Sequence, residues 1–255
     1  MEFIYKIHLY LAFAAYCFTS GFAHYTQSED PHTIGLLIAL GTLFVYNLQQ
    51  AKVKIFREKK WVRIGFLIFL IIAIVYLLLY TLEIKINTWL LLMFLLLFSL
   101  GYNTRLPFIN RTLRQIPMFK IWIIVYIWMG STTLLLYSIE EIPINWHFIV
   151  VHSCFFLALA LLFDLNDRKT DAVELKTIPQ ILGLKSTKVM AFGLLILFDL
   201  ILFQEINLLE KEIFYLFNFY FAGCILISGK ENSSYYTKIL FDSSLIIIGV
   251  MYWMF

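Results

Sequence analysis

The sequence predicts an all-α integral membrane protein that crosses the bilayer about nine times. Hydrophobic side chains make up 61% of the 255 residues, charged ones make up only 15%, and the mean hydropathy is +0.82. This composition leaves too little polar surface to coat a water-soluble globule. Apolar runs of this length are expected to be helices, because backbone amides in lipid must pair within their own segment, and the alternating pattern of a membrane barrel is absent from the sequence.

A helix needs about 20 residues to cross roughly 30 Å of hydrocarbon. The sequence offers nine such windows, at about residues 6–25, 33–49, 64–82, 87–102, 119–138, 145–164, 187–205, 211–228 and 238–255. We expect prolines only between them, because a helix interior rejects a residue without an N–H. All five prolines do fall in the predicted connections: Pro31, Pro107, Pro117, Pro143 and Pro179.

Residues 1–255 are interpreted as one transmembrane helical domain, because the sequence has no linker, low-complexity tract or short-period repeat. The first window could instead be a cleaved signal peptide, since Lys6 precedes its apolar stretch. That stretch is longer than a signal core, which favours a membrane span.

Basic residues indicate the orientation. If the N-terminus is cytoplasmic, every lysine and arginine except Lys85 and Lys211 lies on the cytoplasmic side, as the positive-inside rule requires. We therefore expect a cytoplasmic N-terminus, an external C-terminus and a location in a bacterial inner membrane. Nucleic acid is excluded as a partner because the basic residues are spread over short loops. The basic segment 50–63 could cap a cavity or simply lie on anionic headgroups.

Three aspartates follow the sixth predicted helix where it leaves the membrane. Asp164, Asp167 and Asp171 stand at i, i+3 and i+7, which places them within about 60° of one another if the helix continues. Such carboxylates repel one another unless cations neutralise them, and hard oxygen ligands suit Mg²⁺ together with phosphate oxygens and water. The alternative is a solvated helix end with Arg168 and Lys169 as local partners.

This cluster resembles the second aspartate-rich motif of the UbiA superfamily of intramembrane prenyltransferases. The family pattern is DxxDxxxD at the end of the sixth of nine helices, followed by a basic residue in a K/R-T-hydrophobic-P segment. The three aspartates match the first part and Lys176–Pro179 matches the second. In addition, Tyr102–Arg105 is similar to the family's tyrosine-plus-basic segment, and Ile116–Lys120 is similar to its proline-to-lysine entry into the fifth helix.

The family's first motif, an NDxxD-like cluster at the end of the second helix, should fall at residues 42–51. Asn47 supplies the asparagine. Leu48 and Ala51, however, stand where the family pattern has aspartates. Half of the expected metal site is therefore missing from the sequence.

The resemblance implies a UbiA-like helical bundle, Mg²⁺ as cofactor, and transfer of an isoprenyl group from an isoprenyl diphosphate to a lipophilic acceptor, for example an aromatic one. It implies that Mg²⁺ is bound by Asp164, Asp167 and Asp171. It also implies that Arg105, Lys120 and Lys176 contact the diphosphate. Asn47 would face them from the second helix and also belong to the substrate-binding site.

Two alternatives stay open, a non-catalytic protein that binds a lipid diphosphate and a transporter. The transporter hypothesis depends on ionisable residues inside predicted spans, because buried charge in lipid is costly and suggests function. These residues are His152, Asp199 and Asp242.

Overall fold

The computed structural model describes residues 8–49, 60–76, 79, 84–104, 112–169, 171–229 and 236–255. All regular structure in these ranges is helical, as the sequence predicts. The longer elements are α2 (Leu9–Tyr25), α3 (Pro31–Gln49), α5 (Lys60–Tyr76), α6 (Ile86–Asn103), α7 (Phe119–Met129), α8 (Leu135–Glu140), α9 (Trp146–Asp167), α10 (Ile178–Leu202), α11 (Leu208–Ile227) and α12 (Tyr236–Trp253). The short ones are η2 (Leu113–Gln115), η3 (Gly130–Leu134) and η4 (Val173–Leu175).

Each predicted window overlaps a described helix, and α7, η3 and α8 together cover the fifth. Within the described ranges, four segments are long and apolar enough to cross a membrane, namely Pro31–Gln49, Phe119–Glu140, Trp146–Asp167 and Ile178–Leu202. Shorter apolar helices cover Ile64–Tyr76 and Ile86–Tyr102. The helical fold class is confirmed, and the number of spans stays a prediction.

Two prolines lie in helices and not in connections, which corrects the prediction from the sequence. Pro31 is the first residue of α3, and Pro179 lies in the first turn of α10. A first turn tolerates proline because its N–H groups have no partner inside the helix. Helix α10 begins before residue 187 because Thr177 and Gln180 form a capping box, and it is then kinked at Gly183, where φ is 78°.

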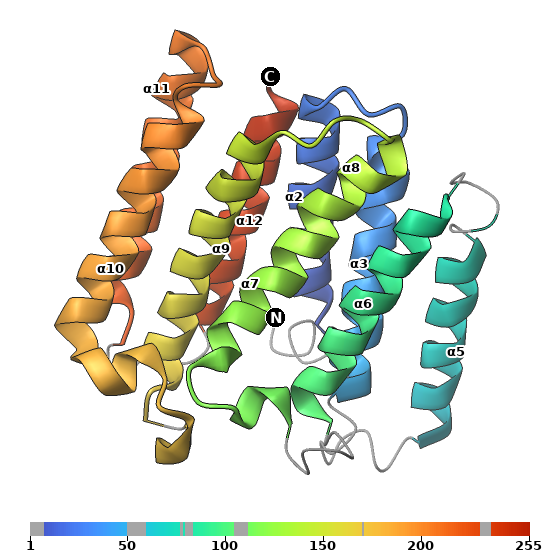
Figure 1. Ribbon diagram of the computed structural model, residues 1–255, viewed down its shortest axis with the longest axis horizontal. Helices are drawn as coiled ribbons and strands as arrows, with labels where there is room; N and C mark the ends of the chain where they lie inside the picture. The colour runs from blue at the N-terminus through green and yellow to red at the C-terminus, as the bar shows by residue number, and fades with distance from the viewer. Residues whose placement is uncertain are drawn as a thin grey trace.

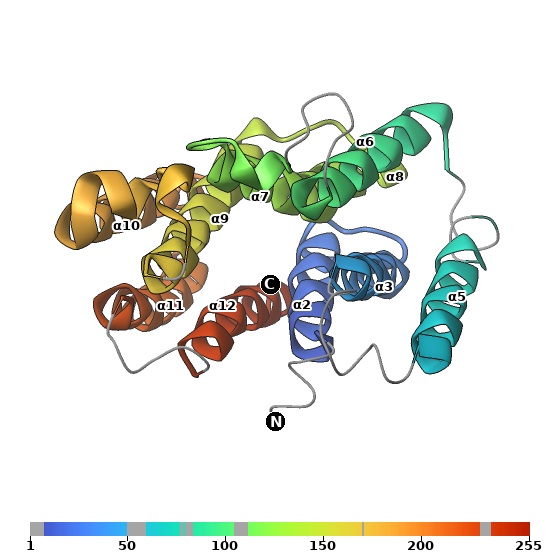
Figure 2. The same cartoon turned by 90° about the horizontal axis from the view of Figure 1, so that it is seen from below.

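The helices are arranged in two layers, seen end-on in Figure 2. One layer contains α6, α7, α8, α9 and α10, and the other contains α5, α3, α2, α12 and α11. In Figure 1 the helices run up and down, with η2 and η4 at the lower end. Helix α9 lies near the centre, and 83% of its apolar window is buried.

Helices α2 and α12 cross at a pair of glycines. A Cβ atom added to Gly21 would lie 2.0 Å from the backbone oxygen of Gly249, and one added to Gly249 would lie 2.2 Å from the oxygen of Cys17. Only residues without a side chain let two helix backbones approach this closely, which is a common device in membrane bundles. The crossing holds α12 beside α2 and thereby positions the α12 side chains described below.

A π-helical segment, η3, joins α7 to α8. Such segments insert an extra residue into a helical turn and redirect the side chains around it. Here Thr133 Oγ1 lies 2.7 Å from His152 Nδ1, and His152 Nε2 lies 2.9 Å from the Tyr252 hydroxyl. The contacts join η3, α9 and α12 in the upper half of the bundle.

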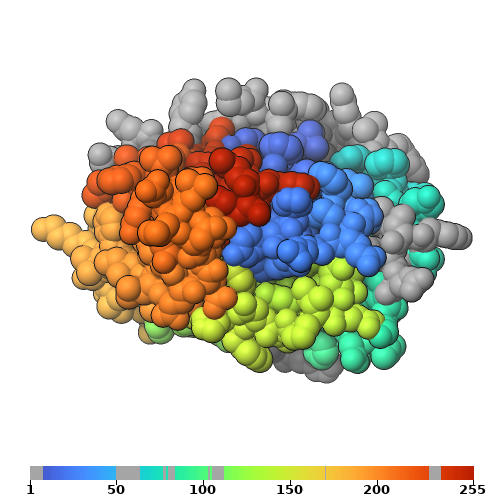
Figure 3. All heavy atoms as spheres, turned by 90° about the horizontal axis from the view of Figure 1, so that it is seen from above, coloured from blue at the N-terminus to red at the C-terminus, as the bar shows by residue number. Residues whose placement is uncertain are grey.

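Figure 3 looks onto the upper end, opposite η2 and η4. Atoms of α2, α12 and α11 meet there with those of the segment that connects α8 to α9. In this view the atoms of these elements cover the upper end.

Candidate functional site

A cavity of about 830 Å³ lies between the two layers. Most of its wall is apolar and aromatic, for example Trp89, Trp128 and Phe156. Charged side chains gather on one part of the wall: Arg114, Lys120, Asp164, Asp167, Lys238 and Asp242. Ligand sites in proteins are typically of this size and combine an apolar wall with a few polar groups. The cavity therefore suits an amphiphile with a charged head and an apolar body.

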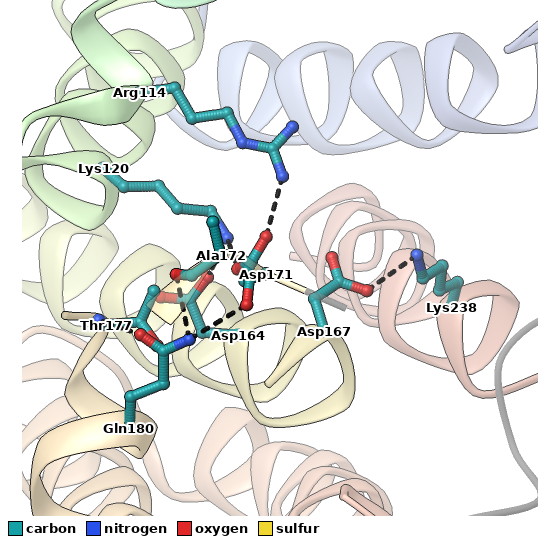
Figure 4. Close-up of polar contacts among 9 residues, drawn as sticks. All are labelled: Arg114, Lys120, Asp164, Asp167, Asp171, Ala172, Thr177, Gln180 and Lys238. Carbon is teal, nitrogen blue, oxygen red and sulfur yellow. Dashed lines mark hydrogen bonds and ion pairs between the residues drawn. The ribbon is translucent and has the colours of Figure 1, made fainter. Parts of the chain in front are cut away.

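Lys120 is buried between two aspartates, as Figure 4 shows. Its Nζ lies 2.6 Å from Asp164 Oδ1 and 2.6 Å from Asp171 Oδ2. Arg114 Nη2 lies 2.9 Å from the other oxygen of Asp171. Removing charge from water is costly, so a buried ammonium of this kind is stable only because carboxylates surround it.

The third aspartate has a different cation. Asp167 Oδ1 lies 3.0 Å from Lys238 Nζ on α12, and both side chains line the cavity. The motif therefore divides, with Asp164 and Asp171 on the side of α7 and Asp167 on the side of α12.

Local structure after α9 explains how Asp171 returns to the cluster. The backbone N–H of Asp171 donates to the carbonyl of Asp167 at 2.8 Å, which keeps Asp171 close to the end of α9. Gln180 Nε2 donates to the carbonyls of Asp171 at 3.2 Å and Ala172 at 3.3 Å, so the start of α10 also holds Asp171 in place. The N–H of Met118 donates to the carbonyl of Leu175 at 3.3 Å and ties η4 to the entry of α7.

Arg114 is a cation with a raised pKa. Burial opposes its charged form, but Tyr102 and the hydrogen bond to Asp171 favour that form more strongly, so the net shift of the Arg114 pKa is upward. Tyr102 and Arg114 both line the cavity. A guanidinium held in this way is well suited to bind phosphate oxygens.

The structure brings together only some of the sequence-predicted residues. Asp164, Asp167, Asp171 and Lys120 are brought together, as described above. Lys176 is exposed, has a left-handed backbone with φ 46°, and is not among the cavity-lining residues. Arg105 lies outside the described residues.

Asn47 is buried on α3 but turns its amide to its own helix. Its Nδ2 donates to the carbonyl of Leu43 at 2.8 Å, and Asn47 is not among the residues that line the cavity. The neighbouring Tyr46 and Gln49 line the cavity instead, and Gln49 Nε2 donates to the carbonyl of Ser99 at 2.7 Å.

Sequence reasoning missed the contributions of Arg114 and Lys238 and gave Asp242 a different role. Lys238 and Asp242 stand at i and i+4 and so share one face of α12. Two charges one turn apart at the start of an apolar helix are a signal that this face meets a polar site. Arg114 gave no comparable signal, because its position depends on how the segment before α7 folds.

The aspartates can supply a metal site only in part. Within the part of the chain that the structure describes, no three His, Cys, Asp or Glu side chains are grouped to hold a metal. All three aspartates have cation partners, but Asp164 and Asp167 line the cavity and Asp171 does not. Mg²⁺ commonly takes one or two carboxylates together with phosphate oxygens and water. Asp164 and Asp167 fit that smaller donor set.

The residues that suggested a transporter form contacts between helices. Both oxygens of Asp199 accept from Asn218 Nδ2, at 2.9 and 3.0 Å, which links α10 to α11. Neither Asp199 nor His152 is among the residues lining the cavity, whereas Asp242 is. Two of the three residues behind the transporter hypothesis therefore serve packing.

Comparisons with protein-family models, with curated proteins and with solved structures give no match to this chain. The resemblance to the UbiA superfamily therefore depends on the sequence motifs alone.

Proposed function

We propose that this chain is a UbiA-like intramembrane prenyltransferase that uses an isoprenyl diphosphate as donor. In this proposal the chain crosses the membrane nine times, with its N-terminus and the charged end of the cavity on the cytoplasmic side of a bacterial inner membrane and its C-terminus outside. The observation that carries the proposal is one cavity of about 830 Å³ with a charged end and an aromatic wall. An isoprenyl diphosphate has the matching division between a polyanionic head and an apolar chain.

Arg114 and Lys120 are the proposed diphosphate-binding residues. Both line the cavity and are oriented by Asp171. A guanidinium and an ammonium have more N–H donors than these carboxylate contacts use, so the remaining donors can bind phosphate oxygens. Negative charge on the departing diphosphate would then be stabilised by side chains that are already in place.

Asp164 and Asp167 are the proposed ligands of Mg²⁺, which when bound would further stabilise negative charge on the diphosphate. The aromatic wall has a separate role. Rings such as Trp128 and Phe156 exclude water from the reacting carbon and present their faces to developing positive charge.

Binding without turnover is the second candidate function. It is favoured by two features of α3. Leu48 stands where the motif has a carboxylate, and the Asn47 amide donates to the carbonyl of Leu43 in its own helix. Without carboxylates at positions 48 and 51 to face those of α9, the site is better equipped to hold a diphosphate than to pull it away from the chain.

Binding and turnover assays on the purified protein in lipid nanodiscs separate these functions. The donors to test are geranyl, farnesyl and geranylgeranyl diphosphate, with phenolic acceptors, in Mg²⁺ or in EDTA. A prenyltransferase should show a raised Tm and Mg²⁺-dependent consumption of donor, both reduced in Asp164→Asn and Asp167→Asn. Asp199→Asn is the matched control, because Asp199 is an intramembrane carboxylate outside the cavity lining.

A raised Tm without consumption of any donor would support the binding protein. If no donor changes the Tm and none is consumed, both functions are excluded.

A further inference from the structure

Helices α5 and α6 form one edge of the bundle. Figure 2 shows them at the same side of the molecule, at the ends of opposite layers. Leu70 alone is buried among the described side chains of α5, and it packs with Ala39 and Leu43 of α3. Helix α5 is therefore held on its α3 side.

The cavity reaches the outer surface of the bundle at this edge. Among the cavity-lining residues that the structure describes, the exposed ones are two side chains of α5 and two of α6, namely Ile71, Val75, Met93 and Leu96. The other lining residues are buried or partly buried. The cavity therefore opens sideways, between α5 and α6.

The opening lies at bilayer depth in the topology proposed above. Met93 and Leu96 follow the first residue of α6, Ile86, by seven and ten positions, which is roughly 10 to 15 Å along the helix. In a hydrocarbon core about 30 Å thick, this position is near the middle. Other exposed apolar side chains flank the opening, as expected of a surface that faces acyl chains: Ile68, Phe69, Ile72, Phe94 and Leu97.

An apolar path leads from the opening to the aromatic wall of the cavity. Leu92 stands next to Met93 and one turn before Leu96, and it also lines the cavity. Leu92 and Trp128 pack against the same buried cluster, which α2, α3 and α8 contribute. The Trp128 ring stacks on Phe156, with centroids 5.8 Å apart. An apolar chain that enters between α5 and α6 therefore reaches Trp128 without passing the charged end of the cavity.

We propose that an acyl chain of a neighbouring phospholipid enters the cavity sideways between α5 and α6 and lies against the aromatic wall at Trp128. The rim of the opening is apolar at all four positions, so it admits a chain but offers no polar partner to a headgroup. Water is a poor occupant of this part, because an ordered water needs about two to four polar partners. A chain instead gains dispersion contacts with the wall. This inference rests on the membrane topology proposed above and does not require prenyl transfer.

The acyl chain would compete with the apolar part of any other ligand. Arg114 and Lys120, the groups proposed to bind a diphosphate, line the same cavity as Trp128. A ligand with its head at these cations and its chain along the aromatic wall must displace the acyl chain. Binding of such a ligand should therefore expel lipid from the surroundings of Trp128.

Brominated lipids test the occupant directly, because bromine quenches tryptophan fluorescence only near contact. Two single-tryptophan proteins are placed in liposomes, one that keeps Trp128 and one that keeps Trp122, with the other tryptophans changed to phenylalanine. Trp122 is 53% exposed and is not among the cavity-lining residues, so it reports on the lipid around the protein. In phosphatidylcholine brominated at mid-chain, each should lose about half of the emission that it has in unbrominated lipid.

A narrowed opening tests the route. Ile71→Phe combined with Met93→Phe should reduce the quenching of Trp128 about threefold, because two bulkier side chains crowd the rim. The matched control is Ile72→Phe combined with Leu97→Phe, since these exposed neighbours do not line the cavity. If the narrowed protein does not fold, Leu96→Phe replaces it.

Two results would overturn the inference. In the first, Trp122 is quenched and Trp128 is not, so that lipid surrounds the protein but does not enter the cavity. In the second, Trp128 is quenched equally in the narrowed protein and in its control, so that the chain does not pass between α5 and α6.

Farnesyl thiodiphosphate, an unreactive donor analogue, separates this inference from the proposed function. Relief of Trp128 quenching, with Trp122 unchanged, would support competition for one cavity. If Trp128 is quenched and the analogue gives no relief, the acyl chain stands and the proposed donor site is wrong. If Trp122 also escapes quenching, the proposed topology is wrong and this inference fails with it.

Discussion

Helix α9 carries a buried polar cluster in each half, and the two clusters differ in what surrounds them. Near its end, Asp164 is ion-paired with Lys120 at 2.6 Å, and both side chains line a cavity of about 830 Å³. In its first half, His152 contacts Thr133 and Tyr252 and is enclosed by aromatic rings, with the Phe22 ring centroid 4.5 Å away. One cluster borders open space and the other is packed.

The comparison shows that a buried polar residue in a membrane helix does not by itself indicate function. His152 is fully buried, with a partner at each ring nitrogen, so it links three elements and presents nothing to a ligand. Lys120 and Asp164 are almost as deeply buried but border the cavity. The cavity beside Lys120 and Asp164, and not the burial of these side chains, is what suits their cluster to ligand binding.

The largest expected effect is that of Lys120→Met, which leaves Asp164 and Asp171 without their shared cation. Removing one partner of a buried ion pair costs about 3 to 5 kcal/mol. The free energy of unfolding, measured by denaturant titration in mixed micelles, should fall by that amount, and binding of isoprenyl diphosphate should be lost. Lys85→Met is the matched control, because Lys85 is exposed and pairs with Glu141 at the surface.

A Lys120→Met protein as stable as the wild type would contradict this ion-pair arrangement. It would mean that the two carboxylates are neutralised by another group in the protein as it exists in the membrane.

An intermediate effect is expected for His152→Leu. The substitution leaves the buried hydroxyls of Thr133 and Tyr252 without this partner, which costs about 1 to 3 kcal/mol of stability. Affinity for the isoprenyl diphosphate should not change, because His152 is outside the cavity lining. His152→Gln, which keeps a donor and an acceptor, should recover part of the stability. A lower ligand affinity in His152→Leu, measured at a temperature where the protein is folded, would contradict this prediction. It would show that the His152 cluster also contributes to ligand binding.

The sequence was sufficient to predict the helices, because long apolar runs and their polar connections depend on local composition. It was not sufficient to predict where a helix starts when capping decides the matter, as at Thr177 and Gln180. The π-helical segment Gly130–Leu134 was also missed, because an extra residue in a turn leaves no mark on an apolar run.

The site was predicted in part. The motif resemblance assigns Asp164 to Mg²⁺ and Lys120 to the diphosphate of one site, and in the structure these two side chains form an ion pair beside the cavity. Arg114 and Lys238 were not expected, since each reaches the aspartates through packing between segments far apart in the chain. Asp199 could not be distinguished from Asp242 in the sequence, because both are single aspartates in apolar helices. Only the packing turns one toward Asn218 and the other into the cavity.

The smallest effect is expected for Lys176, the residue for which the motif and the geometry disagree. The motif resemblance assigns Lys176 to the diphosphate, whereas its side chain is exposed and only Lys120 of the two lysines lines the cavity. An exposed charge acts weakly through water and salt, so Lys176→Gln should change affinity for isoprenyl diphosphate by no more than about twofold. Lys120→Gln should weaken the same binding at least about tenfold, because it removes a buried cation from the site.

If Lys176→Gln is as damaging as Lys120→Gln, the segment between η4 and α10 must close over the ligand and bring Lys176 to its phosphates. The motif would then describe the ligand-bound site better than the arrangement of Figure 4 does.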